Sequence, residues 1–387
     1  MRKWKIWALV LLALWLGARW TMAEAETSLT AISVGKGDAL LLTVGEERFL
    51  IDSGRNWAWG RLNSALDALG VTHLDGVILT HTDKDHAGNM ETLAQSDIGV
   101  DAWYASAIYA DPKKESKHPL VKAAEIRGQR VEFLNAGDEI PCAAGTIAVL
   151  APFGVDEENE NNNSLVLRVD TADGSMLLTG DMELEEEIQL LNSGADLRAD
   201  ILKVAHHGED DATSVSLAQT VKPQAAVICT DSYEAPDTPD PKVLAILENA
   251  GAQTYVTQDA GMAVQLTLSA GAVSVEMLDH DGLPALQNVA LTDVSADPDG
   301  IVLENCSGAA VDLAGWYLYV DRDEEFFLFP QGTILEPGAQ LRVSTRESVQ
   351  KGDISWDEKN VISNKKADLV ALYDPYGRCA DSRETNG

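Results

Sequence analysis

Short apolar runs alternate with helical stretches between about Thr27 and Leu278, and this pattern predicts a mixed α/β domain. Apolar residues recur at helical spacing in two segments that end at a glycine, Leu62–Leu69 before Gly70 and Lys242–Asn249 before Gly251. The predicted strands are Gly76–Leu79, Thr146–Leu150, Ser164–Val169, Ser175–Leu178 and the run that begins at Ile201. Each is short enough to be a buried strand and too short to be a helix.

The pattern changes near Asp279–Leu286, after which little helical spacing remains. Short runs rich in β-branched and aromatic residues follow one another, separated by turn residues. These predicted strands are Val289–Val294, Gly300–Asn305, Trp316–Val320, Glu325–Phe329, Gln340–Val343 and Leu369–Tyr373. We therefore expect a second, all-β domain.

Metal-ligand residues gather where the strand Gly76–Leu79 ends, in His81, Asp83, Asp85 and His86. Alternate residues of an extended segment point to the same face, so the first three share one side. A turn into the next helix can bring His86 beside them. Carboxylates are costly next to an apolar core, and a bound divalent cation removes that cost. A polar turn without metal is the alternative interpretation.

Two further strands end in the same kind of residue. One ends in Gly180–Asp181 and the other in His206, His207 and Gly208. Of the chain's 7 histidines, those at 81, 86, 206 and 207 all lie in these motifs. Such placement at strand ends favours a shared metal site.

The motif series resembles the metallo-β-lactamase superfamily, whose main motif is His-x-His-x-Asp-His. It is more similar to the hydrolase domain of ComEC-type competence proteins, and also resembles choline-phosphate esterases of bacterial surfaces. The matching segments are Val34–Ala39, Leu50–Gly54, His81–His86, Asn162–Leu167, Gly180–Asp181 and Lys203–Gly208. The resemblance implies an αββα sandwich over residues 26–281 and a metal-dependent hydrolase.

The resemblance implies metal ligands at His81, Asp83, Asp85, His86, Asp181 and His207. It implies two divalent ions, zinc or manganese, with Asp181 between them; an oxygen-rich set suits harder cations. Asp83 stands where the superfamily usually has His. No His lies between His118 and His206, so the superfamily's third His is missing.

The implied catalytic residues are Asp85, which orients the nucleophile, and His206, a proton donor beside the ligand His207. In extended backbone the two neighbouring histidines would point to opposite faces. The opposite assignment, with His206 as the metal ligand and His207 as the proton donor, stays open. Substrate contacts are expected at Asn163, Ser164, Thr230 and Asp231.

The C-terminal part, residues 286–387, resembles the lamin-tail domain, an immunoglobulin-like β-sandwich. The resemblance rests on Val311–Leu318 and Phe329–Gly338. In exported bacterial proteins such domains resemble binding or attachment modules, which implies attachment to the cell surface. A stabilising appendage is the alternative. Cys306 and Cys379 are the better candidates for a disulfide, because that bond would tie down the C-terminal segment.

Residues 1–25 have the pattern of a signal peptide: a basic start, an apolar run and an Ala-x-Ala site. An uncleaved anchor is the alternative, and either places the body outside the cytoplasm. The formal net charge of −33 argues against broad coating of nucleic acid, because phosphates are repelled. One basic segment, Pro112–Arg130, is expected either at the cleft rim or on a solvated helix face.

These observations predict an exported phosphodiesterase or nuclease that uses metal-activated water, with DNA among its candidate substrates. One alternative is an esterase acting on another surface substrate, such as choline phosphate on wall polymers, or on a lactone. Another is a surface-binding protein with a vestigial site. Fold alone does not choose among them.

Overall fold

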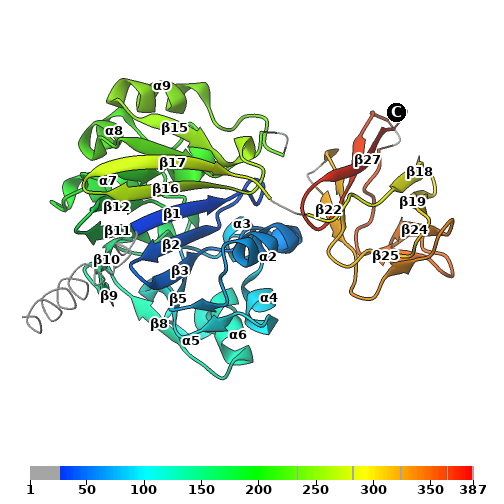
Figure 1. Ribbon diagram of the computed structural model, residues 1–387, viewed down its shortest axis with the longest axis horizontal. Coiled ribbons are helices and arrows are strands. Elements are labelled where there is room, and N and C mark those ends of the chain that lie inside the picture. Colours follow the sequence, from blue (N-terminus) through cyan, green and yellow to red (C-terminus); the bar gives the residue numbers. More distant parts are fainter. Residues whose placement is uncertain (1–26, 233, 281–282, 323–324, 364, 386–387) are drawn as a thin grey trace, which may run out of the picture.

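The computed structural model describes residues 27–232, 234–280, 283–322, 325–363 and 365–385 (Figure 1). The predicted signal peptide lies outside the described residues. Two β-sheets face each other in the N-terminal domain, and an all-β domain follows. Among the described residues, no helix combines the length and the apolar character needed to cross a bilayer.

The first sheet has 8 strands, and most neighbours are antiparallel. Parallel pairing begins where β3 meets β5, so the sheet is mixed. In sheet order the strands are β17 (Ala272–Leu278), β16 (Ala263–Ser269), β1 (Thr27–Ile32), β2 (Leu40–Val44), β3 (Glu47–Ile51), β5 (Gly76–Leu79), β7 (Trp103–Ser106) and β8 (Val131–Leu134).

The second sheet has 7 strands and is also mixed. In order they are β15 (Gln253–Val256), β14 (Ala225–Ile228), β13 (Ile201–Lys203), β12 (Gly174–Leu178), β11 (Val166–Thr171), β10 (Gly145–Ala151) and β9 (Glu139–Cys142). The small pair β4 (His73–Leu74) and β6 (Gly99–Val100) lies apart from both sheets.

Apolar side chains from both sheets, such as Leu42, Ile78 and Leu178, form the core between them. Helices cover the outer faces and form two more cores. On the first sheet lie α2 (Trp59–Ala68), α3 (Lys84–Ala87), α4 (Met90–Gln95), α5 (Pro112–Glu115) and α6 (Pro119–Ile126). On the second lie α7 (Leu184–Asn192), α8 (Val215–Val221) and α9 (Pro241–Ala250). The predicted four-layer αββα sandwich is confirmed.

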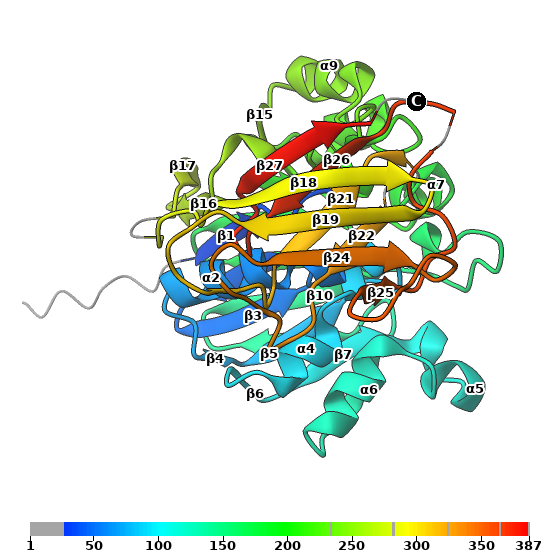
Figure 2. The same cartoon turned by 90° about the vertical axis from the view of Figure 1, so that its right-hand side faces the viewer.

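The C-terminal domain consists of strands with short connections, as predicted, and has a core of its own around Trp316 and Leu318. Figure 2 shows one of its sheets in front of the N-terminal domain. This sheet contains β18 (Val289–Ala296), β19 (Asp299–Asn305), β24 (Gln340–Thr345) and β25 (Ile354–Trp356). The other contains β22 (Glu325–Leu328), β21 (Tyr317–Val320), β26 (Leu369–Tyr373) and β27 (Cys379–Glu384), and β20 (Val311–Asp312) pairs with β23 (Ile334–Leu335).

Cys306 and Cys379 are exposed free thiols, so the expected disulfide between them is wrong in this structure. Cys306 directly follows β19, and Cys379 is the first residue of β27. The strand β18 pairs with β19 and contacts β27. The C-terminal segment is held instead by the ladder between β26 and β27.

An aromatic cluster joins the two domains. The ring of Trp57, just before α2, stacks on Phe326 of β22 with centroids 4.5 Å apart and planes 10° from parallel. Arg61 of α2 donates from Nη2 to the hydroxyl of Tyr317 at 2.9 Å and lies over the Trp57 ring. Tyr317 is only 1% exposed and packs in the core of the N-terminal domain. The contact therefore combines aromatic packing with a hydrogen bond between the domains.

Phe326→Ala is expected to destabilise the chain by about 1–3 kcal/mol, because a half-buried aromatic ring loses its stacking partner and leaves a cavity. Urea unfolding of the full chain measures the change. Phe153→Ala is the control, since Phe153 is 44% exposed. Equal stability of both variants and the wild type would show that the domains are not energetically coupled.

Candidate metal centre

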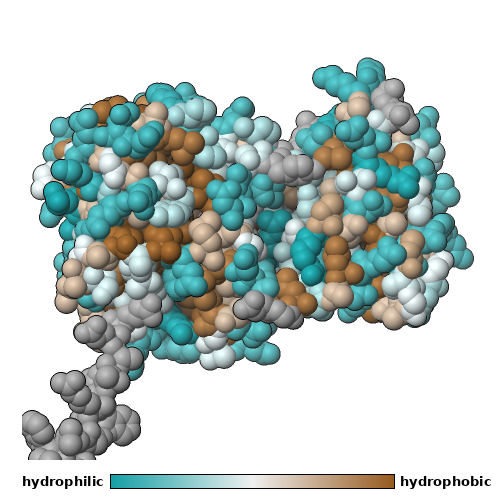
Figure 3. Space-filling view, turned by 45° about the horizontal axis from the view of Figure 1, so that its top comes forward, coloured by the Kyte–Doolittle hydropathy of each residue, from teal (hydrophilic) through white to brown (hydrophobic). Residues whose placement is uncertain are grey.

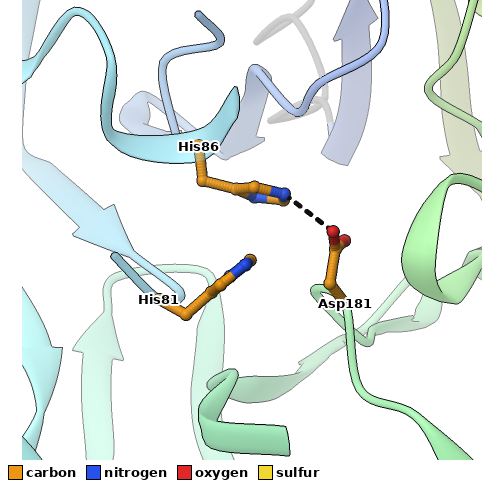
Figure 4. Close-up of side chains that lie close together, drawn as sticks. All are labelled: His81, His86 and Asp181. Atoms are coloured by element: carbon orange, nitrogen blue, oxygen red, sulfur yellow. Dashed lines mark hydrogen bonds and ion pairs between the residues drawn. The ribbon is translucent and has the colours of Figure 1, made fainter. Parts of the chain in front are cut away.

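The ends of β5, β12 and β13 meet at one edge of the sandwich and, with α3, bring the predicted ligands together. His81 follows β5, His86 lies in α3 and Asp181 follows β12; Figure 4 shows their side chains pointing toward one another. The Oδ2 atom of Asp181 lies 3.0 Å from Nε2 of His86 and 3.0 Å from Nε2 of His207. Donor atoms of His81, His86 and Asp181 all lie within 4.8 Å of one another. These distances suit ligands around a shared cation.

The donor atoms fit a divalent cation. Nε2 of His81 is buried and has no hydrogen-bond partner among the described residues, a costly state for a polar atom. Burial, joined by the charge of His86, lowers the pKa of His81 to about 4, so its imidazole is neutral. Burial also lowers the pKa of His207, but the carboxylates of Asp181, Asp85 and Asp38 together more than offset this and raise it to about 9. A cation among these atoms would take the place of that proton.

Hydrogen bonds on the outer side of the rings fix which nitrogen faces the cluster. Nδ1 of His86 lies 2.7 Å from Oδ2 of Asp52, and Nδ1 of His207 lies 2.8 Å from the Cys229 carbonyl. With a proton on each Nδ1, the Nε2 lone pairs of His86 and His207 point inward, as metal-ligating histidines require. Asp52 itself accepts from the backbone and hydroxyl of Thr80.

A buried lysine completes the cluster. Lys203 of β13 is fully buried, and its Nζ lies 2.5 Å from Oδ2 of Asp38 and 3.4 Å from Oδ1 of Asp181. Burial lowers the pKa of Lys203, but the two carboxylates more than offset this and hold it above its usual value. One oxygen of Asp181 thus faces the histidines and the other faces this ammonium. Sequence reasoning assigned no role to Asp38 or Lys203.

Lys203→Met is expected to destabilise the protein by about 3–5 kcal/mol, because it leaves the buried Asp38 without its cation. Thermal or denaturant unfolding measures the loss. Lys242→Met is the control, since that side chain is 63% exposed. A Lys203 variant as stable as this control would show that the buried pair contributes nothing to folding.

The backbone at His206 and His207 is not extended. An extended backbone was the premise for placing the two side chains on opposite faces, and that premise is wrong. His206 has φ 46° and His207 has φ 53°, both in the left-handed region. Non-glycine residues rarely adopt it, and such strain concentrates at functional sites. The turn buries His207 in the cluster and leaves the His206 side chain 13% exposed. Nδ1 of His206 lies 2.8 Å from Asp211, and its Nε2 lies 3.3 Å from the Asn161 amide.

The two remaining carboxylates of the first motif are more exposed than the His86, His207 and Asp181 side chains. Asp85 approaches His207 with Oδ2 at 3.4 Å from Nε2. Asp83 lies 3.8 Å from Nε2 of His81, and its side chain is 48% exposed. Both are therefore within reach of an ion, but Asp83 is the outermost of the predicted ligands.

The expected substrate contacts are mostly turned inward. Asn163, Ser164 and Thr230 are almost fully buried. Ser164 Oγ lies 3.3 Å from Nδ1 of His81 and accepts from the backbone of Asp181, which places it behind the ligands. Thr230 bonds Thr238. These side chains are placed to support the site from within, whereas Asp231 is half-buried.

Two acidic residues of α7 anchor neighbouring backbone. Glu186 and Glu187 of α7 are 2% and 1% exposed and accept from the backbone of Phe153 and Ser214. In the basic segment, Arg127 turns inward and donates to the carbonyls of Leu93 and Ser96. Elsewhere hydrophilic side chains cover much of the face shown in Figure 3, over both domains, in keeping with the net charge of −33.

The chain is similar to bacterial competence proteins. It is 29% identical over 256 residues to ComE operon protein 3 of Bacillus subtilis, covering 62% of this chain and 33% of that protein. It is 26% identical over 278 residues to competence protein ComA of Neisseria gonorrhoeae, covering 70% and 37%. The chain thus spans about a third of the length of these relatives.

Among solved structures, the metallo-β-lactamase fold protein YhfI from Bacillus subtilis matches with a TM-score of 0.43 and 14% identity, over 65% of this chain and 100% of that one. The model of the lamin tail domain matches residues 284–387. The model of the metallo-β-lactamase superfamily matches residues 32–232, which include every predicted ligand. This chain belongs to the metallo-β-lactamase superfamily and carries a C-terminal lamin tail domain.

Proposed function

We propose that this protein is an exported, metal-dependent phosphodiesterase, with nucleic acid among its substrates. The observation that carries the proposal is the convergence of His81, His86, His207 and Asp181 around a common point in the described structure. The similarity to proteins named for competence supports a phosphodiester over other esters.

The ligand set supports two divalent ions, zinc or manganese. His86, His207 and Asp85 would hold one ion, and His81 with Asp83 would hold the other, with Asp181 in the same cluster. Bound ions of this kind supply Lewis-acid chemistry and lower the pKa of the water bound to them toward neutrality. Carboxylate-rich sets favour manganese, and imidazoles favour zinc.

The chain's own residues have distinct parts in the reaction. Asp85 would orient the nucleophile, because its Oδ2 lies 3.4 Å from Nε2 of His207 and its side chain, 17% exposed, is more accessible than those of His86, His207 and Asp181. His206 would transfer a proton to the scissile group from Nε2. Its Nδ1 donates to Asp211, so the proton on Nε2 is the second proton of an imidazolium ring; in the structure this nitrogen lies 3.3 Å from the Asn161 amide nitrogen. Lys203 keeps Asp38 and Asp181 in place from behind and does not touch substrate.

A second candidate is hydrolysis of a smaller ester, such as choline phosphate on wall polymers, or of a lactone. Acidic groups around His206, namely Glu183, Glu209 and Asp211, favour it because they repel a long polyanion. Export would place either activity outside the cytoplasm. The lamin tail domain would then attach the enzyme to the cell surface.

The test is hydrolysis of bis(4-nitrophenyl) phosphate by the full chain, with 4-nitrophenyl acetate and a lactone as competing substrates. We expect turnover of the phosphodiester that a chelator abolishes and added manganese or zinc restores. No phosphodiester cleavage with either metal, together with cleavage of the carboxylic ester or lactone, would contradict the proposal and favour the second candidate. Inactivity on all three substrates would favour a vestigial site.

A further inference from the structure

The C-terminal domain docks on a part of the N-terminal domain that contacts the metal motif. In Figure 1 the helices α2 and α3 lie on the side of the N-terminal domain next to the C-terminal domain. The approach is close, because a Cβ atom on Gly60 of α2 would overlap the carbonyl of Pro375. A Cβ atom on Gly377 would likewise overlap the guanidinium of Arg61. The two surfaces therefore fit together with no room for an added methyl group at either glycine.

Trp57 lies at the centre of this contact and is 2% exposed. Its ring stacks on Phe326 of the C-terminal domain with centroids 4.5 Å apart. The same ring lies against Gly35, where an added Cβ atom would be 2.5 Å from its Cη2 atom. Trp57 thus touches the C-terminal domain and, at the same time, the loop of residues 35–38 between β1 and β2.

Loop 35–38 in turn contacts the metal centre. The backbone N–H of Asp38 donates to the carbonyl of Asp85 at 3.1 Å, and a Cβ atom on Gly37 would be 2.6 Å from that same oxygen. The side chain of Asp38 pairs with the buried ammonium of Lys203. A shift of this loop would therefore disturb a predicted metal ligand and the buried ion pair together.

The segment that carries Trp57 also binds α3, the helix of the metal motif. The backbone N–H of Ser53 donates to the carbonyl of His86 at 2.7 Å. The amide of Asn89, just after α3, donates to the carbonyl of Arg55 at 2.6 Å. The surface on which the C-terminal domain docks is thus hydrogen-bonded to the helix that supplies His86.

A second connection runs through charged side chains. Arg61 donates to the hydroxyl of Tyr317 in the C-terminal domain at 2.9 Å. Burial raises the pKa of Glu234 to about 7, and the charge of Arg61 limits the rise. Oε2 of Glu234 accepts from the backbone N–H of Lys36 at 2.9 Å. Glu234 therefore holds loop 35–38 and interacts with the guanidinium that binds the C-terminal domain.

We propose that the C-terminal domain is a positioning element of the metal centre, in which Phe326 and Tyr317, acting through Trp57 and Arg61, hold loop 35–38 against Asp85. This role goes beyond attachment to a surface, because a tether could dock anywhere on the N-terminal domain. The inference rests on the metal centre of the proposed function and does not depend on the substrate.

Gly60→Ala is the variant that should separate the domains, because the added methyl group overlaps the Pro375 carbonyl while alanine favours the helix α2 itself. Hydrogen exchange of the full chain without metal is followed by mass spectrometry. Exchange of the amides in loop 35–38 is expected to rise about tenfold or more, relative to the core strand β14, which reports wider unfolding. Gly308→Ala is the matched control, since its added methyl group meets no atom within 4 Å.

Phe326→Ala is a second undocking variant, for the case that the domains accommodate the extra methyl group, because it removes the ring that stacks on Trp57. Calorimetry measures the affinity of the full chain for manganese, or for zinc if manganese does not bind. The affinity is expected to fall about threefold or more in both undocking variants and to stay unchanged in Gly308→Ala. Unchanged loop exchange, or unchanged metal affinity, in both undocking variants would overturn the inference.

Neither readout needs hydrolysis, so this inference and the proposed function fail separately. If the wild type cleaves no phosphodiester, yet both undocking variants show faster loop exchange and weaker metal binding, the function fails and the positioning role stands. If the wild type cleaves the phosphodiester and the undocking variants exchange and bind metal as it does, the positioning role fails alone. A wild type that binds neither ion would contradict both.

Discussion

Asp181→Asn is expected to lose most of its bound metal and to lower turnover by about a hundredfold or more. Mutation of a residue that only hydrogen-bonds a metal ligand already lowers metal affinity or activity by up to about a hundredfold. The amide keeps the shape of the carboxylate but removes the charge that faces His86 and His207 at 3.0 Å. Metal content by mass spectrometry and phosphodiester turnover measure the two effects on the same preparation.

Asp196→Asn is the matched control, because that carboxylate is 75% exposed and its ion pair is with Arg168, not with a histidine of the cluster. Circular dichroism shows whether Asp181→Asn keeps the fold, which matters because Lys203 also contacts Asp181. Wild-type metal content in a folded Asp181→Asn protein would remove Asp181 from the ligand set.

The two adjacent histidines are expected to separate metal binding from turnover. His207→Ala should lose metal, because its Nε2 is buried beside Asp181 and its Nδ1 is bonded to the Cys229 carbonyl. His206→Ala should keep the metal and lower turnover by about a hundredfold, the usual scale for a proton-transfer group. Its ring lies outside the cluster, against Asp211.

Metal stoichiometry and turnover are measured for both variants, with the double variant as a reference for additivity. The informative comparison is His206→Ala, because the wild type and this variant should hold equal metal. If His206→Ala loses metal and His207→Ala retains it, the two roles are exchanged.

Much of the fold could be predicted because apolar runs report burial directly. The predicted strand Gly76–Leu79 matches β5, and the predicted helix Lys242–Asn249 matches α9 with its stop at Gly251. The edge strand β27 was missed because Cys379–Glu384 is mostly polar and largely exposed, so it has no apolar alternation. The short strand β25, Ile354–Trp356, was missed as well.

Sequence reasoning brought the histidines and Asp181 to one place, because strand ends that carry ligands meet at one edge of the sandwich. It did not foresee the left-handed turn at His206 and His207, since local sequence before Gly208 reads equally well as extended chain. Lys203 had a visible signal, a charged residue inside an apolar strand. Its partner Asp38 is distant in sequence, so only the tertiary structure shows the pair.

The most direct test of the metal centre is a crystal of the full chain grown with manganese, with anomalous scattering recorded at a wavelength where manganese contributes strongly. We expect an anomalous peak bonded to Nε2 of His86, Nε2 of His207 and Oδ2 of Asp181, with any second peak on the His81 side. A peak only at the surface group of His73, Asp75 and Asp101, or none at all in protein that is active, would contradict the account.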